Sequence, residues 1–261
     1  MKSNVIKYIF FIAVIIIVGV AVYMIYEDNK SNSENTENQT TAQTNQTITD
    51  LRMEIVSYDT INPLISNNRN VQEITKLVFE PLLQLDENYK LQPCLATEWA
   101  KSGDTSYILK LRNNVKWQDG TSFTAQDVKY TIETLKQINS IYSYNVQHVT
   151  SVDIIDNYSI RINLDTIIPF FEYNLIFPIV SSTYFAGQDI QNTEKNNTPI
   201  GTGMYKIESN SDNTVVLKKN TSWWNISEKN AKVDTINVNK YSSMGEAYNA
   251  FKLGNIDILT I

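Results

Sequence analysis

The stretch from Leu109 to Val128 constrains the fold of this chain more than any other part of it. Its sequence, LKLRNNVKWQDGTSFTAQDV, begins at the end of an alternating apolar strand and continues through a tight Asp119–Gly120 turn. A helix start follows at Thr124, and Asp127 stands three residues later, which is the spacing of a capping box. The stretch therefore predicts a strand, a turn and a capped helix in direct succession.

Composition and charge limit the class of protein. The chain has 261 residues, 42% hydrophobic and 19% charged, which suffices to bury the core of one large or two modest domains. Its net charge of −6 and sequence pI near 4.9 argue against a nucleic acid as partner. Because it has a single cysteine, Cys94, and a single histidine, His148, the sequence excludes an internal disulfide, a cysteine-based metal cluster and a multi-histidine metal site. We expect no metal site and no cofactor.

An apolar run precedes the part of the chain expected to fold. Residues 8–26 (YIFFIAVIIIVGVAVYMIY) carry no charge and as a helix would be about 28 Å long, enough to cross a membrane. Positive charges lie before the run and negative charges after it, so residues 1–7 are expected to stay in the cytoplasm. The length and bulky end of the run favour an uncleaved transmembrane anchor over the alternative, a cleaved signal peptide. Residues 27–49 are polar and aperiodic, which predicts a disordered linker.

Residues 50–261 show strand and helix patterns without a regular βαβ repeat. Strands are predicted from period-two alternation of apolar residues, and helices from apolar residues three or four apart. Strands are predicted at Leu51–Tyr58, Tyr107–Leu111 and Ile256–Leu259, and hairpins at Val152–Leu164 and Met204–Lys218. A first helix is predicted to be capped by Asn70 and ended by Pro81, and a second helix, after Thr124, is predicted to bury Val128, Thr131, Ile132 and Leu135. A third helix is predicted at Ser243–Leu253, with Ala247, Ala250 and Phe251 inward and Gly254 as its C-terminal cap. The expected fold class is α+β, a mixed sheet with flanking helices.

Seven short blocks stand in a fixed order along this part of the chain. They are Ile61–Pro63, Val78–Leu82, Pro93–Trp99, Tyr107–Val128, Pro199–Tyr205, Asn220–Trp224 and Ala250–Ile258. Together they resemble the family 5 extracellular solute-binding proteins of ABC importers, the oligopeptide, dipeptide and nickel-binding group. The resemblance implies two lobes that close on a ligand, in chains about twice as long as this one. We therefore expect residues 50–261 to be the first lobe of a periplasmic-binding-protein-like fold, in truncated form.

The resemblance also implies a function. It implies capture of peptides, including oligopeptides, outside the membrane and their delivery to ABC permease subunits, with a nickel chelate or another small solute as the alternative ligand. The expected location is the cell membrane of a Gram-positive bacterium, with a single pass at residues 8–26 and the folded domain outside. The chain is not expected to be an enzyme. The alternative is a naturally truncated, membrane-tethered remnant or interaction module without transport activity.

Two segments are candidates for contact with the ligand. The resemblance points to the loop after the first strand and to a segment after the signature helix, which here contain Ser66, Asn67, Asn68 and Arg69 and then Tyr142 and Tyr144. Tyrosine combines a large apolar face with one hydroxyl, which suits variable ligands. Arg69 is able to pair with a ligand carboxylate through two hydrogen bonds. The alternative is that these are ordinary loop residues.

Other conspicuous residues are expected to serve the structure. This is the expectation for four residues of the signature stretch, Lys110, Arg112, Trp117 and Asp127. The Gly201–Gly203 pair lacks the lysine and hydroxyl residue of a phosphate loop, so it predicts backbone flexibility at a strand entry. A nucleophilic pair of Cys94 and His148 is disfavoured, because Cys94 lies in an apolar sequence and no third residue is fixed.

Overall fold

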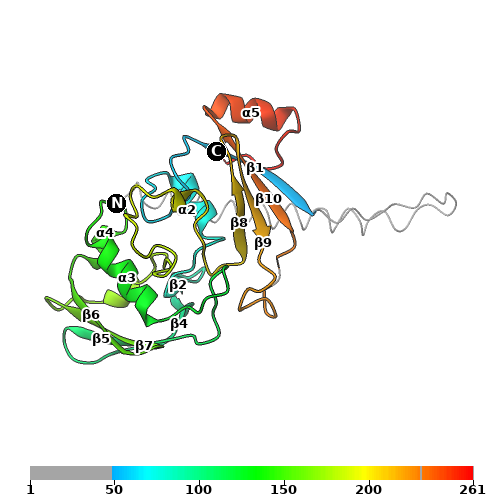
Figure 1. The fold of residues 1–261 in the computed structure, drawn as a ribbon. Coiled ribbons are helices and arrows are strands. Elements are labelled where there is room, and N and C mark those ends of the chain that lie inside the picture. Colours follow the sequence, from blue (N-terminus) through cyan, green and yellow to red (C-terminus); the bar gives the residue numbers. More distant parts are fainter. Residues whose placement is uncertain (1–48, 230, 261) are drawn as a thin grey trace. The chain divides into compact units, whose positions relative to one another are not determined.

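Two four-stranded sheets organise residues 49–229 and 231–260, which are the residues that the computed structural model describes (Figure 1). The first sheet has the strand order β1-β10-β9-β8. It consists of β1 (Asp50–Val56), β8 (Tyr205–Asn210), β9 (Thr214–Lys219) and β10 (Thr235–Tyr241). β1 pairs with β10 in parallel, whereas the other pairs are antiparallel, so the sheet is mixed.

The second sheet is antiparallel and lies below the first in the view of Figure 1. Its order is β4-β5-β7-β6, built from β4 (Ala96–Lys101), β5 (Ser106–Leu111), β6 (Val149–Asp156) and β7 (Ser159–Leu164). Alternate residues of β5 and β7 are buried, as the period-two pattern predicts, and α3 (Ala125–Leu135) packs against this sheet.

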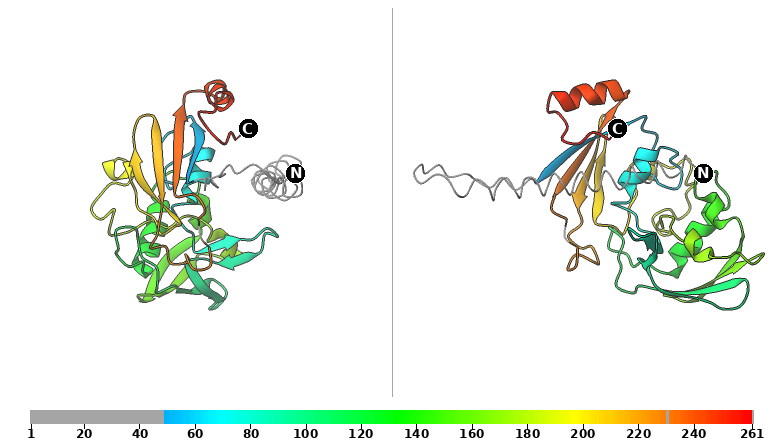
Figure 2. Two further views of the ribbon diagram at one scale, coloured as in Figure 1. Left: turned by 90° about the vertical axis from the view of Figure 1, so that its right-hand side faces the viewer. Right: turned by 180° about the vertical axis from the view of Figure 1, so that it is seen from behind.

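Shorter elements connect and cover the two sheets. They are α2 (Arg69–Thr75), the hairpin of β2 (Leu83–Leu85) and β3 (Leu91–Pro93), α4 (Ser143–Val146), α5 (Met244–Lys252), and the 3₁₀ turns η1 (Phe171–Asn174) and η2 (Glu194–Asn197). From the side and from behind, α5 lies at the end of the first sheet remote from the second sheet (Figure 2). The expected α+β class, a mixed sheet with flanking helices, is confirmed.

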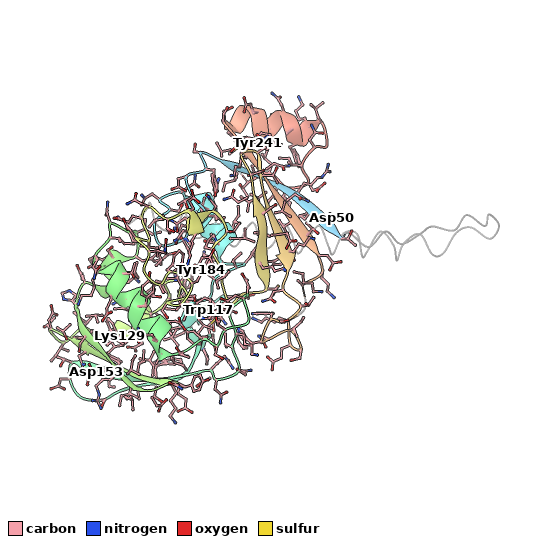
Figure 3. The ribbon with its side chains drawn as sticks, viewed as in Figure 1. Asp50, Trp117, Lys129, Asp153, Tyr184 and Tyr241 are labelled. Carbon is pink, nitrogen blue, oxygen red and sulfur yellow. The ribbon has the colours of Figure 1, made fainter. Side chains whose placement is uncertain are left out.

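The signature stretch folds as predicted, and Asp127 explains why. This buried carboxylate accepts the backbone N–H of Thr124 at 2.8 Å, which satisfies one free donor at the start of α3. It also accepts the indole N–H of Trp117 at 3.3 Å and both the backbone N–H and the hydroxyl of Ser182. Trp117 lies deep between the two sheets (Figure 3). The expected structural roles of Trp117 and Asp127 are therefore confirmed.

Four predicted boundaries, faces or strands are wrong. α2 is capped by Asn68 and not by Asn70, because the Asn68 side chain accepts the N–H groups of Asn70 and Val71, and the helix ends at Thr75, before Pro81. Phe251 is 42% exposed, because Ala247 and Ala250 form the buried face of α5. Ile256–Leu259 makes only an isolated parallel bridge between Ile258 and Met53.

The predicted segments before the folded part cannot be compared with the structure. Residues 1–7, the apolar run 8–26 and the polar linker 27–49, except for Thr49, lie outside the described residues. Within residues 49–229 and 231–260, no helix has the length and apolarity needed to cross a membrane.

A buried carboxylate, Glu80, links the segment after α2 to the segments that precede β8 and follow β9. It accepts the hydroxyl of Thr202 at 2.8 Å and the indole N–H groups of Trp223 at 3.0 Å and Trp224 at 2.8 Å. Burial raises the pKa of Glu80, while these donors and the charge of Arg112 act in the opposite direction. The Arg112 guanidinium lies 4.2 Å above the Trp224 ring and donates to the Cys94 carbonyl at 2.6 Å, which confirms its structural role.

The Gly201–Gly203 segment packs directly against backbone. Gly203 N–H donates to the Val78 carbonyl at 2.8 Å, and Gln118 exchanges hydrogen bonds with Gly201. A Cβ at Gly201 would lie 1.9 Å from the Val78 carbonyl oxygen, and one at Gly203 would lie 2.7 Å from the Leu77 carbonyl oxygen. Glycine is therefore required at these positions because two chain segments approach closely, and not because the backbone is flexible there, as the sequence predicted.

We predict that Glu80→Gln destabilises the fold by about 1–3 kcal/mol, because the amide NH₂ would face an indole or hydroxyl donor. The folded-state pKa of Glu80 is raised, so its stabilising contribution is complete below the unfolded pKa near about 4.3 and is lost as pH rises through the folded pKa. The cost of the substitution should therefore be largest at acid pH. Urea unfolding at several pH values measures it.

The control for this prediction is Glu98→Gln, which removes only an exposed pair with Lys110 at 3.2 Å. A cost of Glu80→Gln that increased from about pH 5 to about pH 8 would show instead that the fold holds the ionised carboxylate.

We predict that Gly201→Ala destabilises the fold by about 3 kcal/mol or more, because the new methyl group would overlap the Val78 carbonyl. Gly245→Ala is the matched control. The nearest neighbour of the new methyl group would be Ser243 Oγ, at 3.8 Å. Because Gly245 lies in the first turn of α5, the substitution should stabilise the fold by about 0.4–1 kcal/mol. Equal effects in thermal or urea unfolding would refute the packing argument.

Candidate functional site

A polar hollow of about 660 Å³ opens where β1 and β10 end beside the β8–β9 turn. Tyr241, on its wall, stands at the α5 end of the first sheet (Figure 3). The lining residues carry hydroxyl, amide, carboxylate and ammonium groups: Ser57, Tyr58, Asp59, Thr60, Asn197, Asn210, Ser211, Asp212, Lys240, Tyr241 and Ser242. A wall of this kind offers both donors and acceptors to a polar solute.

Lys240 is the fixed cation of this hollow. Its Nζ donates to Asn210 Oδ1 at 2.7 Å and to the Ser211 carbonyl at 2.6 Å, and it lies 3.8 Å from the centroid of the Tyr58 ring. Among the described residues, no carboxylate lies within ion-pair distance of it. Burial lowers the pKa of Lys240, and the charge of Asp212 partly opposes this effect. The ammonium group is thus held by neutral acceptors, and its charge stays available to an anion.

The loop after β1 supports this hollow. The Asp59 carboxylate accepts the Ser66 hydroxyl at 2.7 Å and the Asn67 N–H at 2.8 Å. The Asn68 amide donates to the carbonyls of Val56 at 2.9 Å and Ser57 at 2.5 Å. Ser66 is buried, so its hydroxyl holds the loop and is not exposed to solvent. Most polar groups of this loop therefore form hydrogen bonds within the protein.

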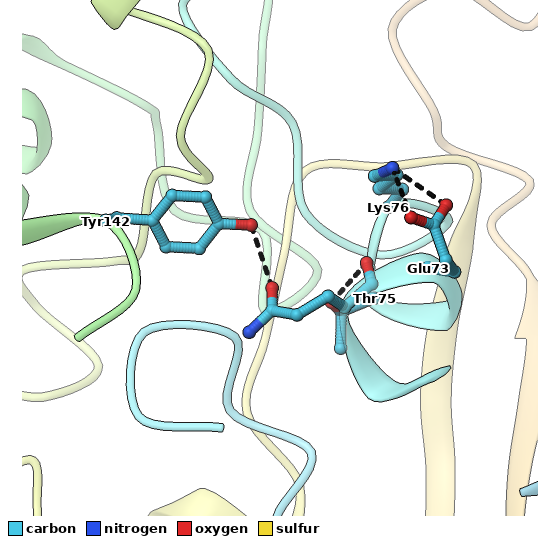
Figure 4. A network of polar contacts seen from close by, with 5 residues as sticks. Glu73, Thr75, Lys76 and Tyr142 are labelled. Atoms are coloured by element: carbon cyan, nitrogen blue, oxygen red, sulfur yellow. Dashed lines mark hydrogen bonds and ion pairs between the residues drawn. The ribbon is translucent and has the colours of Figure 1, made fainter. Parts of the chain in front are cut away.

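Gln72 connects the loop to Tyr142, whose hydroxyl and its hydrogen bond are drawn in Figure 4. Its side-chain amide donates to the carbonyls of Pro63 at 2.9 Å and Ser66 at 2.8 Å, and its carbonyl accepts the Tyr142 hydroxyl at 2.8 Å. Burial, and then the charge of Glu73, raises the pKa of Tyr142 to about 12, so the phenol stays protonated as a donor. The two predicted segments, far apart in sequence, thus meet through one buried amide.

The structure does not bring all six predicted residues together. Ser66, Asn67, Asn68 and Tyr142 belong to the connected loop network described above. Arg69 is exposed at the start of α2, and its side chain makes no ion pair or hydrogen bond within the described part of the chain. Tyr144 is 74% exposed on α4.

None of the residues that line the hollow is among the six predicted from sequence, and the main omissions are Tyr58, Lys240 and Tyr241. Tyr58 was placed at the end of a predicted strand, whereas no element was predicted at β10, which carries Lys240 and Tyr241. The alternation of Ile236 and Val238, both buried, is the signal that could have found this strand.

The groups considered for nucleophilic or metal chemistry have ordinary surroundings. Cys94 is buried, and burial raises the pKa of its thiol, so the reactive thiolate is disfavoured. His148 Nδ1 lies 3.0 Å from Asp165 Oδ1 in a partly exposed pair. Within residues 49–229 and 231–260, no group of three His, Cys, Asp or Glu side chains is placed to hold a metal ion.

Comparison with known proteins gives the family. Residues 90–261 match the profile described as bacterial extracellular solute-binding proteins, family 5, middle part. The glutathione-binding protein GsiB of Escherichia coli K12 is 28% identical over 172 residues, which cover 64% of this chain and 34% of that protein.

Solved structures of solute-binding proteins are similar to this chain in fold. NikZ from Campylobacter jejuni in complex with Ni(L-His) is 28% identical with a TM-score of 0.72, covering 80% of this chain and 43% of that chain. The ABC transporter substrate-binding protein CtaP from Listeria monocytogenes is 25% identical with a TM-score of 0.70, covering 81% and 44%.

The chain spans about a third of the length of the curated relatives it matches and less than half of each solved structure. The similar proteins are solute-binding proteins and not enzymes, in agreement with the sequence-based expectation. The resemblance carried by the seven blocks is confirmed, and the fold is that of a lobe of a periplasmic-binding-protein-like protein. The chain belongs to family 5 of the bacterial extracellular solute-binding proteins.

Proposed function

We propose that residues 50–261 form the first lobe of a substrate-binding component of an ABC importer, and that the protein captures peptides outside the membrane for a permease. Family membership over residues 90–261 is the observation that carries this proposal. Glutathione, named for the GsiB relatives, is itself a short peptide, which favours peptides as the ligand class. The ligand would bind without chemical change and would be enclosed by hinge closure of two lobes.

The hollow beside β10 is the wall that we propose for ligand contact. A peptide carries an ammonium group, a carboxylate and repeated amide groups, so it needs charges of both signs and hydrogen-bonding side chains. Lys240 and Asp212 would supply the two charges, and the tyrosines Tyr58 and Tyr241 would supply apolar faces with hydroxyl groups. This combination suits ligands that share a backbone but differ in side chains.

The residues predicted from sequence keep a place in this proposal. Ser66, Asn67 and Asn68 would position the wall, since they hydrogen-bond to Asp59 and Ser57. Tyr142 would fix the loop through Gln72. Arg69 and Tyr144 are the exposed members and are the ones free to reach a ligand carboxylate or an apolar side chain.

A nickel chelate is the second candidate ligand. The NikZ structure, which contains Ni(L-His), is as similar in sequence to this chain as the GsiB relatives are. A chelate brings its own metal ligands, so its organic part is able to bind without metal-ligating side chains from the protein.

We also propose that residues 8–26 anchor the protein in the cell membrane of a Gram-positive bacterium and that residues 27–49 hold the folded part outside. The uncharged length of the run and the charges around it support this orientation. The family description, which gives its members as bacterial and extracellular, supports the same location for the folded part.

We predict that the full-length protein binds di- and tripeptides, glutathione among them, with a Kd of about 1 μM or tighter, and nickel–histidine more weakly. Isothermal titration calorimetry of each ligand at equal ionic strength measures this. Tight binding of nickel–histidine with no heat from any peptide would reject the peptide assignment in favour of the chelate.

We predict that Asp212→Asn and Lys240→Met each weaken peptide binding by about tenfold or more, because a charge-assisted hydrogen bond to the ligand is lost. Lys218→Met is the matched control, since Lys218 lies on β9 and pairs only with Glu208 at 3.7 Å. Lys240→Met should also lower the melting temperature by loosening the β8–β9 turn, whereas Asp212→Asn should not. Unchanged affinity in the folded Asp212→Asn variant would remove the hollow from the binding site.

A further inference from the structure

A second cavity, of about 470 Å³, lies beside the edge strand of the second sheet and shares no residue with the polar hollow. Its lining comes from β4, β5 and the segment that enters η1: Trp99, Ala100, Lys101, Tyr107, Pro169, Phe170 and Glu172. Trp99, Tyr107 and Phe170 give it aromatic walls, and Glu172 is its carboxylate. Nothing in the proposed transport function uses this cavity.

Tyr107 contributes an almost fully buried ring to the wall of this cavity. Tyr107 is 3% exposed, and its hydroxyl makes no hydrogen bond with any residue that the structure describes. An unpaired buried hydroxyl is costly, and such groups usually find a partner in protein, water or ligand. Burial and then the nearby charge of Glu172 raise the pKa of Tyr107, so the phenol stays protonated. The carboxylate of Glu172 has no ion-pair partner among the described residues.

The cavity rim holds an aromatic residue in a strained and exposed position. Phe170 has a φ of 57°, a left-handed conformation that side chains other than glycine rarely adopt, and it is 73% exposed. Its ring meets that of Tyr173 edge to face, with centroids 6.4 Å apart. Backbone strain of this kind is concentrated at functional sites. The fold therefore holds a large apolar ring at the mouth of the cavity without burying it.

A cation already lies near one of the aromatic rings of this cavity. The ammonium group of Lys101 lies 5.9 Å from the centroid of the Tyr107 ring, near the limit for attraction between a cation and an aromatic face. Lys101 is exposed on the edge strand β4, so its flexible side chain is able to leave for solvent. Aromatic faces together with one carboxylate are the chemistry that recognises organic ammonium groups.

We propose that this cavity is a binding site for a small organic cation, held over the faces of Trp99, Tyr107 and Phe170 with its charge opposite Glu172. The cation displaces the Lys101 ammonium group from its place over the Tyr107 ring. The site is separate from the solute-binding hollow, so its occupation does not depend on the identity of the transported ligand.

Choline and its neutral isostere 3,3-dimethylbutan-1-ol test the proposal on the full chain, because they share a shape and differ in charge. Ligand-detected NMR titration should give a Kd for choline about tenfold lower than that for the alcohol. Equal binding of both compounds, or no binding of either, would overturn the proposal.

Three variants locate the site. Phe170→Gly removes the ring and relieves the positive φ, so it should lose choline binding without lowering the melting temperature. Glu172→Gln should weaken choline about tenfold, whereas Lys101→Met should strengthen it, because the competing ammonium group is gone. Glu133→Gln is the control, since this exposed carboxylate lies on α3 near Lys129 and away from the cavity lining.

Outcomes other than these would reject the site or its occupant. Choline binding that is insensitive to Phe170→Gly and Glu172→Gln would place the cation elsewhere. Failure of choline, combined with variant-dependent binding of a lysine-containing peptide, would reject the free small molecule in favour of a side chain of a partner.

Discussion

The Glu80 carboxylate is the group on which the rest of the structure depends. It lies at the point where the chain leaves α2, and its three donors come from segments more than a hundred residues later in the sequence. An isolated buried carboxylate is strongly unfavourable, whereas one surrounded by hydroxyl and indole donors fixes the segments that supply them. Thr202 enters β8, and Trp223 and Trp224 follow β9, so one carboxylate determines where the first sheet meets the rest of the lobe.

This junction gives physical meaning to the sequence blocks that identify the family. Val78–Leu82 contributes the carboxylate and the backbone carbonyls, Pro199–Tyr205 contributes two glycines and a threonine, and Asn220–Trp224 contributes two indoles. The glycines are needed because no Cβ fits against the backbone at Val78 and Leu77. Three of the seven blocks are thus parts of one contact.

Local elements were predictable from sequence, whereas contacts between distant segments were not. The α3 helix and both antiparallel hairpins follow from apolar periodicity, turn residues and a cap within a few positions. The parallel pairing of β1 with β10 has no local signal, because its partners are separated by most of the folded chain. For the same reason the sequence points to the loop at Ser66–Arg69, which supports the hollow without lining it, and not to Lys240, which lines the hollow from β10. The Asn68 cap was assigned to Asn70, since several asparagines compete within one turn.

The pairing of β1 with β10 also determines the order in which the lobe is able to form during synthesis. The second sheet uses residues between Ala96 and Leu164 only, so it is able to assemble as soon as that segment has emerged from the ribosome. β1 is made first, but it has to wait for Thr235–Tyr241 before its hydrogen bonds are satisfied. Until β10 is made, the backbone groups of β1 form an unpaired strand edge, which is open to pairing with other chains.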